Sequence, residues 1–246
     1  MKNTFRFYEV GGKVRDEILG LESKDVDYVA VPKDSLIEEF SEASDVFKVL
    51  IDYLNHEKFQ IFLITESCYT IRARFPEGHK YQGVADFVMA RKEIGYLPGT
   101  RTPIVKPGTL LDDLVRRDFT LNAMAKDDSG EIIDPFNGME DLARGILKTP
   151  LPFDVTFHDD PLRILRAIRF SITKGFTIPE DMAEFIKAYD YEAFMAPVVS
   201  VERIREELFK CFKFDSYLTI KKLSEFPRLL EYIFMTKIWL KPTMED

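Results

Sequence analysis

Two aspartates, Asp25 and Asp27, stand two residues apart at the start of the apolar run 26–31, which predicts a β-strand. Side chains two apart on a strand point to the same face of a sheet, so the two carboxylates would lie together. Carboxylate oxygens are the hard ligands that Mg²⁺ takes beside a nucleotide's phosphates. The pair therefore predicts a site for two Mg²⁺ ions, which would activate a hydroxyl and stabilise leaving pyrophosphate. The alternative is a solvated turn before a strand.

A two-metal site of this kind usually needs a third carboxylate, and Asp86 is the best candidate. It lies at the start of the apolar run 84–90, another predicted strand. A strand-end acid that faces solvent is the alternative for this residue. Arg91 follows the same run and could bind phosphates or form a surface ion pair with Glu93. The predicted metal ligands, which are also the predicted catalytic residues, are Asp25, Asp27 and Asp86.

Two glycines precede the aspartate pair in the chain. Gly11 and Gly12 join the end of a strand-like run, 7–10, to a segment expected to be helical, 13–19. Glycines at such a turn let backbone N–H groups approach a phosphate, and a helix N-terminus adds positive potential there. A phosphate cradle and a metal site in one stretch indicate a metal-dependent nucleotidyltransferase.

A second cluster of polar side chains falls in the segment 113–125, which we expect to be one helix. Asp118 and Asn122 are four residues apart and would share a helical face with Arg117. An arginine for phosphates, with an aspartate and an asparagine for ribose hydroxyls, is suited to holding a nucleotide. Ordinary surface pairs at a helix N-terminus are the alternative.

A third group begins the amphipathic segment 160–174. Asp160 and Arg163 are three residues apart, so their side chains would lie side by side on a helix. Asp160 could accept a hydrogen bond from the exocyclic amino group of a base, and Arg163 could donate one to a ring nitrogen. Cytosine and adenine both offer that pattern, whereas uracil and guanine offer the opposite order, so the pair could select C and A. Arg166 recurs on the same side. The alternative for Asp160, which precedes Pro161, is a helix N-cap.

The elements that must position these residues fall into two parts. The first 100 residues are mixed, whereas the chain is helical from about residue 110, so we predict an α+β head, 1–145, followed by an all-helical domain, 146–246. Residues 95–109 contain three prolines and predict a mobile loop. The predicted strands are 5–10, 26–31, 59–64, 69–75 and 84–90, and the other predicted helices are 44–55, 139–144, 201–213 and 215–240.

Composition limits the functional classes. The 246 residues carry a net charge of −8, a mild argument against a nucleic-acid partner that a local basic groove would override. Two distant cysteines indicate reduced thiols, and the N-terminus resembles no signal peptide, so we expect a cytoplasmic protein with no membrane association.

Taken together, these segments resemble the class II tRNA nucleotidyltransferases, the CCA-adding enzymes, and their bacterial poly(A) polymerase relatives. The matching stretches occur in the family's order and are VGGKVRDEILGLESKDVDYVAV, RKEIGY, DDLVRRDFTLNAMAKDDSGEIIDPFNGMEDL, DDPLRILRAIRF and VSVERIREEL. The resemblance implies a palm-like head and a helical neck. It implies metal binding by the Asp25 and Asp27 pair, triphosphate contacts from Gly11, Gly12 and Arg15, ribose binding by Arg117, Asp118 and Asn122, and an amino-acid template for CTP and ATP formed by Asp160 and Arg163.

The function implied is addition of C and A to the 3′ end of tRNA, with Mg²⁺, CTP and ATP. A CC-adding, A-adding or poly(A)-polymerising relative is the nearest alternative, and an inactive nucleotide- or RNA-binding module is another. The template segment begins Asp159-Asp160, where the family usually has Glu-Asp. The chain ends at residue 246, so the family's body and tail regions are expected to be absent, and a naturally short form, a homodimer and a truncated form are the alternatives.

Overall fold

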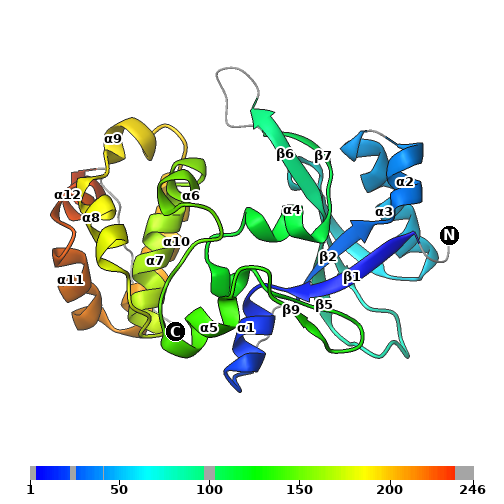
Figure 1. Ribbon diagram of the computed structural model, residues 1–246, viewed down its shortest axis with the longest axis horizontal. Coiled ribbons are helices and arrows are strands. Elements are labelled where there is room, and N and C mark those ends of the chain that lie inside the picture. Colours follow the sequence, from blue (N-terminus) through cyan, green and yellow to red (C-terminus); the bar gives the residue numbers. More distant parts are fainter. Residues whose placement is uncertain (1–3, 23–25, 41, 97–102, 236–246) are drawn as a thin grey trace, which may run out of the picture. The chain divides into compact units, whose positions relative to one another are not determined.

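The computed structural model describes residues 4–22, 26–40, 42–96 and 103–235. The chain forms two compact units, 1–139 and 140–246. The first unit is built on a mixed sheet and the second consists of helices (Figure 1). This arrangement confirms the predicted fold class.

The first unit contains a seven-stranded sheet in the order β3-β4-β5-β2-β1-β8-β9. Only the β2–β5 pair is parallel among the described pairings of this sheet, and the others are antiparallel. The strands are β1 (Phe5–Val10), β2 (Asp27–Pro32), β3 (Gln60–Thr65), β4 (Thr70–Arg74), β5 (Val84–Met89), β8 (Ala125–Lys126) and β9 (Ile132–Ile133). The helices are α1 (Gly12–Ile18), α2 (Asp34–Glu39), α3 (Ala43–His56), α4 (Leu110–Val115) and α5 (Gly138–Arg144), which crosses into the second unit, with short 3₁₀ turns η1 (Glu66–Cys68) and η2 (Thr120–Asn122).

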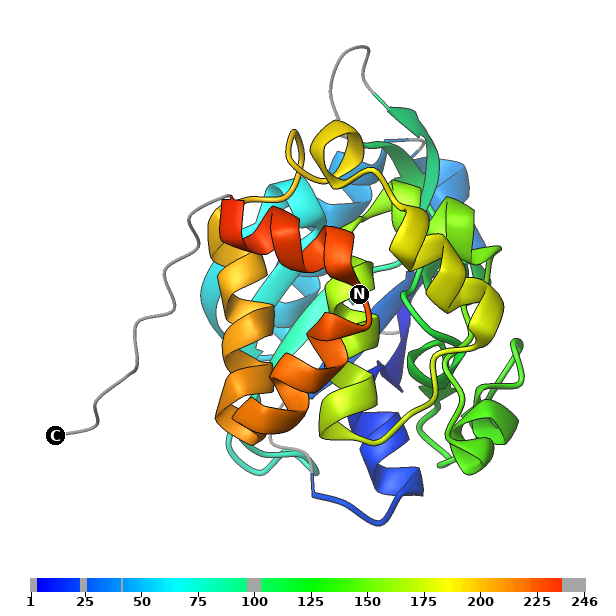
Figure 2. The same ribbon diagram turned by 90° about the vertical axis from the view of Figure 1, so that its left-hand side faces the viewer.

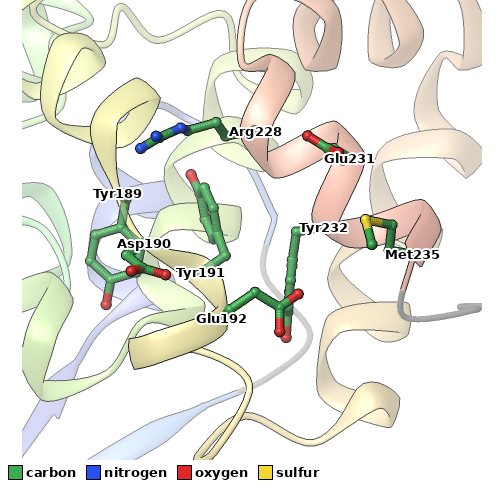
Figure 3. Close-up of a pocket in the computed structure, with 8 residues that line it drawn as sticks. All are labelled: Tyr189, Asp190, Tyr191, Glu192, Arg228, Glu231, Tyr232 and Met235. Carbon is green, nitrogen blue, oxygen red and sulfur yellow. The ribbon is translucent and has the colours of Figure 1, made fainter.

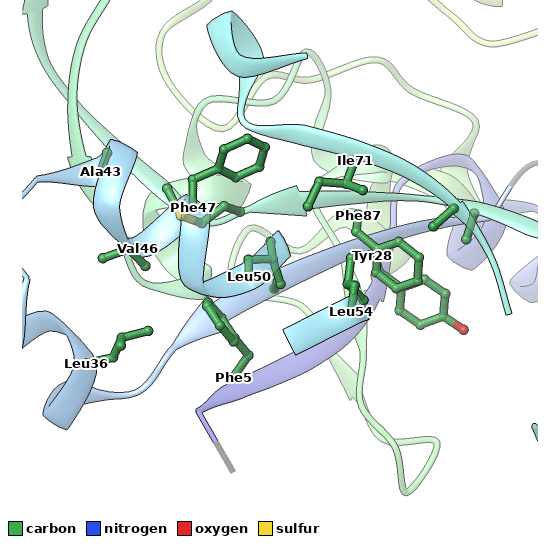
Figure 4. Packing of buried hydrophobic residues seen from close by; sticks show 14 of the residues in the cluster. Phe5, Tyr28, Leu36, Ala43, Val46, Phe47, Leu50, Leu54, Ile71 and Phe87 are labelled. Carbon is green, nitrogen blue, oxygen red and sulfur yellow. The ribbon is translucent and has the colours of Figure 1, made fainter. Parts of the chain in front are cut away.

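Alternation along the strands separates two apolar clusters on the two faces of the sheet. Tyr28 and Ala30 of β2 belong to the first cluster, which α3 covers with Val46, Leu50 and other apolar side chains (Figure 4). The second cluster consists of Val10, Val29, Ala90, Leu114, Ala123 and Ala125. Asp27, two residues before Val29, therefore lies on the face of the second cluster.

The predicted loop 95–109 is wrong in part. Residues on both sides of 97–102, which lie outside the described residues, form a hairpin of β6 (Arg91–Tyr96) and β7 (Pro103–Pro107). At the base of the hairpin, Gly108 donates its N–H to the Ala90 carbonyl at 3.0 Å. A Cβ on Gly108 would lie 2.5 Å from the carbonyl carbon of Arg91, so this position requires glycine.

The predicted single helix 113–125 is also wrong. Helix α4 ends at Val115, and the chain then turns through η2 into β8. All of residues 119–125 are buried, so the segment has no solvent-facing side that an amphipathic helix would require. The Asp118 carboxylate also accepts from the Phe119 N–H at 2.8 Å, a local bond that competes with helix formation.

The second unit is helical. Helix α7 packs against α10 and α11, and α12 packs against α8 and α9 (Figure 2). The helices are α6 (Phe153–Asp159), α7 (Leu162–Thr173), α8 (Glu180–Ala188), α9 (Tyr191–Phe194), α10 (Val201–Phe214), α11 (Ser216–Ser224) and α12 (Pro227–Met235). The predicted helix 215–240 is thus two helices up to residue 235, beyond which the residues are not described. No helix in the described part of the chain is long and apolar enough to cross a membrane.

Candidate active site

Two of the three predicted carboxylates lie on neighbouring strands. Asp27 and Asp86 are register partners of the parallel strands β2 and β5. Phe87 and Met89 of β5 face the first cluster, so Asp86 faces the opposite side, as Asp27 does. Register partners on adjacent strands are about 5 Å apart at the backbone, so both side chains reach one location. Asp25 lies outside the described residues, so its predicted role stays a prediction.

Gly11 brings the strand-to-helix turn against Asp27. Its backbone has φ +72° and ψ −136°, a conformation that side-chain-bearing residues rarely adopt. A Cβ on Gly11 would lie 3.1 Å from Nη1 of Arg117 and 3.6 Å from Oδ2 of Asp27. Because Gly11 has no side chain, the Arg117 guanidinium and the Asp27 carboxylate can both lie close to its backbone. Gly12 is the first residue of α1.

Arg117 is oriented by Asp113, a residue that the sequence reasoning missed. Nε and Nη2 of Arg117 donate to Oδ2 of Asp113 at 3.1 and 2.8 Å, and Arg116 donates to Oδ1. Asp113 is fully buried. Burial favours the neutral acid, but the Arg117 and Arg116 guanidiniums outweigh it and hold the pKa of Asp113 below its usual value. The signal for this network was the i,i+3 and i,i+4 spacing in DDLVRR.

Arg15 is buried rather than exposed to a ligand. Its Nη1 donates to Oδ1 of Asn122 at 2.6 Å, and Nε and Nη2 donate to Asp16 at 2.9 Å. Nδ2 of Asn122 donates in turn to Oδ1 of Asp118 at 2.9 Å. The predicted helical face is wrong, yet these side chains do meet, because the turn after α4 brings Asn122 back over Asp118. Arg15 thus joins α1 to η2.

Arg91 is also more buried than either sequence reading expected. Its side chain is 11% exposed, and its Nη2 lies 3.8 Å from Oε1 of Glu93. Nη1 donates to the carbonyl of Cys68. Burial, with a further contribution from Arg116, lowers the pKa of Arg91. Arg91 and Glu93 thus form the predicted ion pair, but Arg91 is largely buried and does not lie on the surface.

In the second unit, Asp160 and Arg163 lie at the junction of α6 and α7. Oδ1 of Asp160 accepts from the Leu162 N–H at 3.2 Å, so this carboxylate does cap the first turn of α7. Oδ2 accepts from Nη2 of Arg203 at 3.2 Å. Nη1 of Arg163 donates to the Thr156 carbonyl at 3.2 Å. Arg203 thus reaches Asp160 from α10.

Arg166 belongs to an ion cluster around Glu207. Glu207 is 4% exposed. Its carboxylate lies 2.5 Å from Nε of Arg169, 3.0 Å from Nζ of Lys210 and 3.9 Å from Nη1 of Arg166. Burial would raise the pKa of Glu207, but the cations, Arg169 foremost, overcome this and lower it. The cluster joins α7 to α10.

A cavity of about 520 Å³ in the second unit involves a different set of side chains. It lies where α9 and its preceding loop face α12 (Figure 3). Its lining residues are Tyr189, Asp190, Tyr191, Glu192, Arg228, Glu231, Tyr232 and Met235. None of the predicted site residues is among them, so the candidate site rests on the carboxylate and arginine geometry of the first unit.

Most of the chain is similar to proteins of known families. Residues 7–148 match the poly A polymerase head domain family. A multifunctional CCA protein of Nitrosomonas eutropha is 34% identical over 206 residues, which are 82% of this chain and 43% of that protein. One of Neisseria gonorrhoeae is 38% identical over 207 residues, with the same coverage of 82% and 43%. The chain therefore spans about two fifths of the length of these relatives.

Solved structures show the same architecture. The Thermotoga maritima CCA-adding enzyme complexed with tRNA has a TM-score of 0.67 and 26% identity, covering 91% of this chain and 47% of that one. The Bacillus stearothermophilus CCA-adding enzyme in complex with CTP has a TM-score of 0.67 and 28% identity, covering 90% and 47%. A tRNA nucleotidyltransferase complexed with a primer tRNA and an incoming ATP analogue has a TM-score of 0.67 and 29% identity, covering 93% and 59%.

Proposed function

We propose that this chain, which belongs to the poly A polymerase head domain family, is an RNA nucleotidyltransferase that adds C and A to the 3′ end of tRNA. In the proposed reaction the terminal 3′-hydroxyl attacks the α-phosphate of CTP or ATP. The bond to the β-phosphate oxygen breaks and pyrophosphate leaves. The observation that carries the proposal is the register pairing of Asp27 with Asp86 beside the Gly11 turn.

The carboxylates fit divalent metal binding. Asp27 and Asp86 are both partly exposed and share one sheet face, and their oxygens are the donor type that Mg²⁺ prefers. Asp86 also lies 3.6 Å from Nε of Arg72, a cation that would balance its charge before metal arrives. We assign Asp25, Asp27 and Asp86 as ligands of two Mg²⁺ ions. Bound there, the metal would supply charge stabilisation for the attacking and leaving oxygens.

The residues around Gly11 would hold the triphosphate. The backbone N–H groups at the Gly11-Gly12 turn can approach phosphate oxygens because no side chain intervenes. Arg117 directs Nη1 to the same turn, held there by buried Asp113. Arg15 would act indirectly, by fixing Asn122 and hence the turn that also contains Asp118. Asp118 and Asn122 remain our candidates for the ribose hydroxyls, and Arg91 for a phosphate.

Selection of C and A is assigned to Asp160 and Arg163 in the second unit. A carboxylate has about four acceptor sites, so the bonds from Leu162 and Arg203 leave capacity for an exocyclic amino group. Arg203 would hold the Asp160 carboxylate in its orientation. Arg166, which faces Glu207, is assigned a supporting position beside the nucleotide.

The test is to incubate the purified chain with Mg²⁺ and with tRNA that lacks its CCA end. Each nucleotide is supplied separately. We expect incorporation from CTP, and from ATP on tRNA that already ends in CC, with none from UTP or GTP. Addition of A alone, of C alone, or of long A tracts would identify one of the narrower relatives instead. No incorporation at any tRNA concentration would refute the proposal.

The matched variants are Asp27→Ala and Asp128→Ala. Asp27→Ala should abolish turnover and weaken Mn²⁺ binding measured by titration, with an unchanged circular dichroism spectrum. Asp128 is an exposed acid whose side chain is 75% accessible, so its variant should keep full activity. Retained turnover in Asp27→Ala would rule out this carboxylate as a required ligand.

A further inference from the structure

The face that carries Asp27 and Asp86 continues outward over β4 and β3, and this extension has its own composition. Ile71 and Ala73 of β4 are fully buried in the first cluster. Their neighbours Arg72 and Arg74 therefore point to the opposite face, which is the face of the two aspartates. The described members of the second cluster do not come from β3 or β4, so that cluster leaves this part of the face open within the first unit.

Three consecutive apolar side chains are exposed on β3, which is an edge strand of the sheet. Phe62, Leu63 and Ile64 are 50%, 56% and 40% accessible. Leu63 is the register partner of Arg72 and shares its face, and Phe62 lies at the register shift between Ile61 and Leu63, whereas Ile64 is the partner of Ile71 and points to the opposite face. Exposed apolar side chains in a row on an edge strand are a liability that proteins usually cover or avoid. Their presence therefore calls for an occupant.

The cations on β4 lie beside two of these side chains, Phe62 and Leu63. The Arg74 guanidinium lies 5.4 Å from the ring centroid of Phe62, within cation–π range. Arg72 is the register partner of Leu63 on one side and of Asp86 on the other. A guanidinium has five N–H donors, more than the contact of Arg72 with Asp86 uses. Outward from Asp86, the next side chain on this face is therefore Arg72. The Phe62 ring follows, in contact with Arg74.

We propose that Phe62, Arg72 and Arg74 bind the single-stranded 3′ end of the RNA primer and lead it to Asp27 and Asp86. Phe62 offers a ring on which a base can stack, and the two arginines offer charge for its phosphates. This combination of a stacking platform and cations along a groove is how proteins bind single strands without reading their sequence. The inference rests on the proposed function, because it needs an RNA end to be brought to these carboxylates.

Charge decides between RNA and a second protein chain at this edge. A protein that covered this face of β3 and β4 would bury Arg72 and Arg74 and would need acids to match them, whereas a strand paired to the free edge of β3 would lie on the side away from β4 and leave both arginines exposed. A polyphosphate strand supplies both the planar bases and the negative charge. It also explains why the row is continuous with the catalytic carboxylates, which a dimer contact would not require.

The test measures RNA binding apart from turnover. The intact chain is titrated against a 5′-fluorescein single-stranded RNA octamer ending in CC, with anisotropy as the readout and without nucleotide. Since one stacked base contributes about 1–3 kcal/mol, Phe62→Ala should weaken binding by about tenfold. Arg74→Ala should reduce the slope of log K against log salt by about 0.7, the value for one phosphate contact on a single strand. Binding of CTP should stay unchanged in both.

The controls are matched in residue type and exposure. Phe214, 59% accessible in α10, and Arg144, 60% accessible in α5, give Phe214→Ala and Arg144→Ala. Phe62→Leu keeps apolar volume without a ring and should bind as weakly as Phe62→Ala, whereas Phe62→Tyr should bind as the wild type does. These two variants keep the test valid if the alanine variant folds poorly.

Equal RNA affinity in Phe62→Leu, Arg74→Ala and the control variants would overturn the inference. A wild-type dimer in sedimentation that Phe62→Ala dissociates, with RNA affinity unchanged, would also overturn it and assign the edge to a second copy. If the wild-type chain adds no nucleotide but Phe62→Leu and Arg74→Ala still weaken RNA binding, the binding site is supported and the proposed reaction is refuted. The two failures are therefore distinguishable.

Discussion

Replacement of Asp113 by asparagine tests how the first unit holds Arg117. The substitution keeps the shape of the side chain but removes the negative charge that two guanidiniums share. Asp113 is fully buried, whereas the side chains of Arg116 and Arg117 are 26% and 19% exposed. The variant therefore leaves two arginines without their common anion in a site that water reaches only in part.

The magnitude follows from this burial. Removing one partner of a fully buried ion pair costs about 3–5 kcal/mol. Because both arginines keep some contact with water, we expect a loss of about 2–4 kcal/mol in the free energy of unfolding. With about 2–4 °C per kcal/mol for a chain of this size, the melting temperature should fall by about 5–15 °C. Within the same reasoning, Arg117 would lose its fixed direction toward Gly11, and misplacement by about 1 Å costs about a hundredfold in rate.

Thermal unfolding followed by circular dichroism gives the first readout, and kcat/KM for CTP gives the second. The control is Asp128→Asn, since Asp128 is an exposed acid paired with Lys80 and should change stability by less than about 1 kcal/mol. A melting temperature for Asp113→Asn equal to that of Asp128→Asn would refute the argument that Asp113 is an essential buried partner. A stable variant with unchanged kcat/KM would also show that Arg117 does not need Asp113 for its position.

Two further predictions concern the turn and the helical unit. Gly11→Ala should destabilise the fold by about 1–3 kcal/mol, because its φ of +72° strains an alanine, and should lower activity, because the new Cβ would lie 3.1 Å from Arg117; equal melting and activity would contradict it. Glu207→Gln should destabilise the chain at neutral pH, where the ionised carboxylate binds Arg169. Since folding lowers the pKa of Glu207 from about 4.5, its stabilisation is present above that pH and is lost as pH falls through the folded value. The difference between wild type and Glu207→Gln, measured by urea unfolding, should therefore shrink as the pH falls below about 4.5, and a difference that stays constant with pH would contradict the linkage.

Local patterns predicted the five longer strands of the central sheet, β1 to β5, because each is a run rich in aromatic and β-branched residues. The two-residue strands β8 and β9 were not predicted. Apolar runs identified β2 and β5 as strands, and the structure then places Asp27 and Asp86 on one face of the sheet. The parallel pairing that makes these two residues partners was not predictable from either segment. It depends on the strand order, in which β2 lies between β1 and β5.

The segment after α4 shows why a helical pattern misled the sequence reasoning. Asp118 and Asn122 are four residues apart, a spacing that fits a helix. The residues between and after them would, however, place buried side chains on every side of such a helix. Burial of the whole stretch, rather than of one face, is a tertiary property. The hydrogen bond between Asn122 and Asp118 then arises in a turn. The prediction that these two side chains lie together is confirmed, but they meet in a turn and not on the face of a helix.

The arginines show a second limit, because sequence gives charge but not burial. Arg15 and Arg117 both stand near glycines or acids that suggest phosphate contacts, yet Arg15 is bound to Asp16 and Asn122 inside the unit. Arg117 is held by Asp113 with its Nη1 against the Gly11 turn. The space that a Cβ would fill at Gly11 thus lies between a guanidinium and a carboxylate of opposite charge. A triphosphate needs a cation and a metal-binding carboxylate within reach of the same backbone, so the absent side chain of Gly11, more than any single charged residue, makes this turn suitable for one.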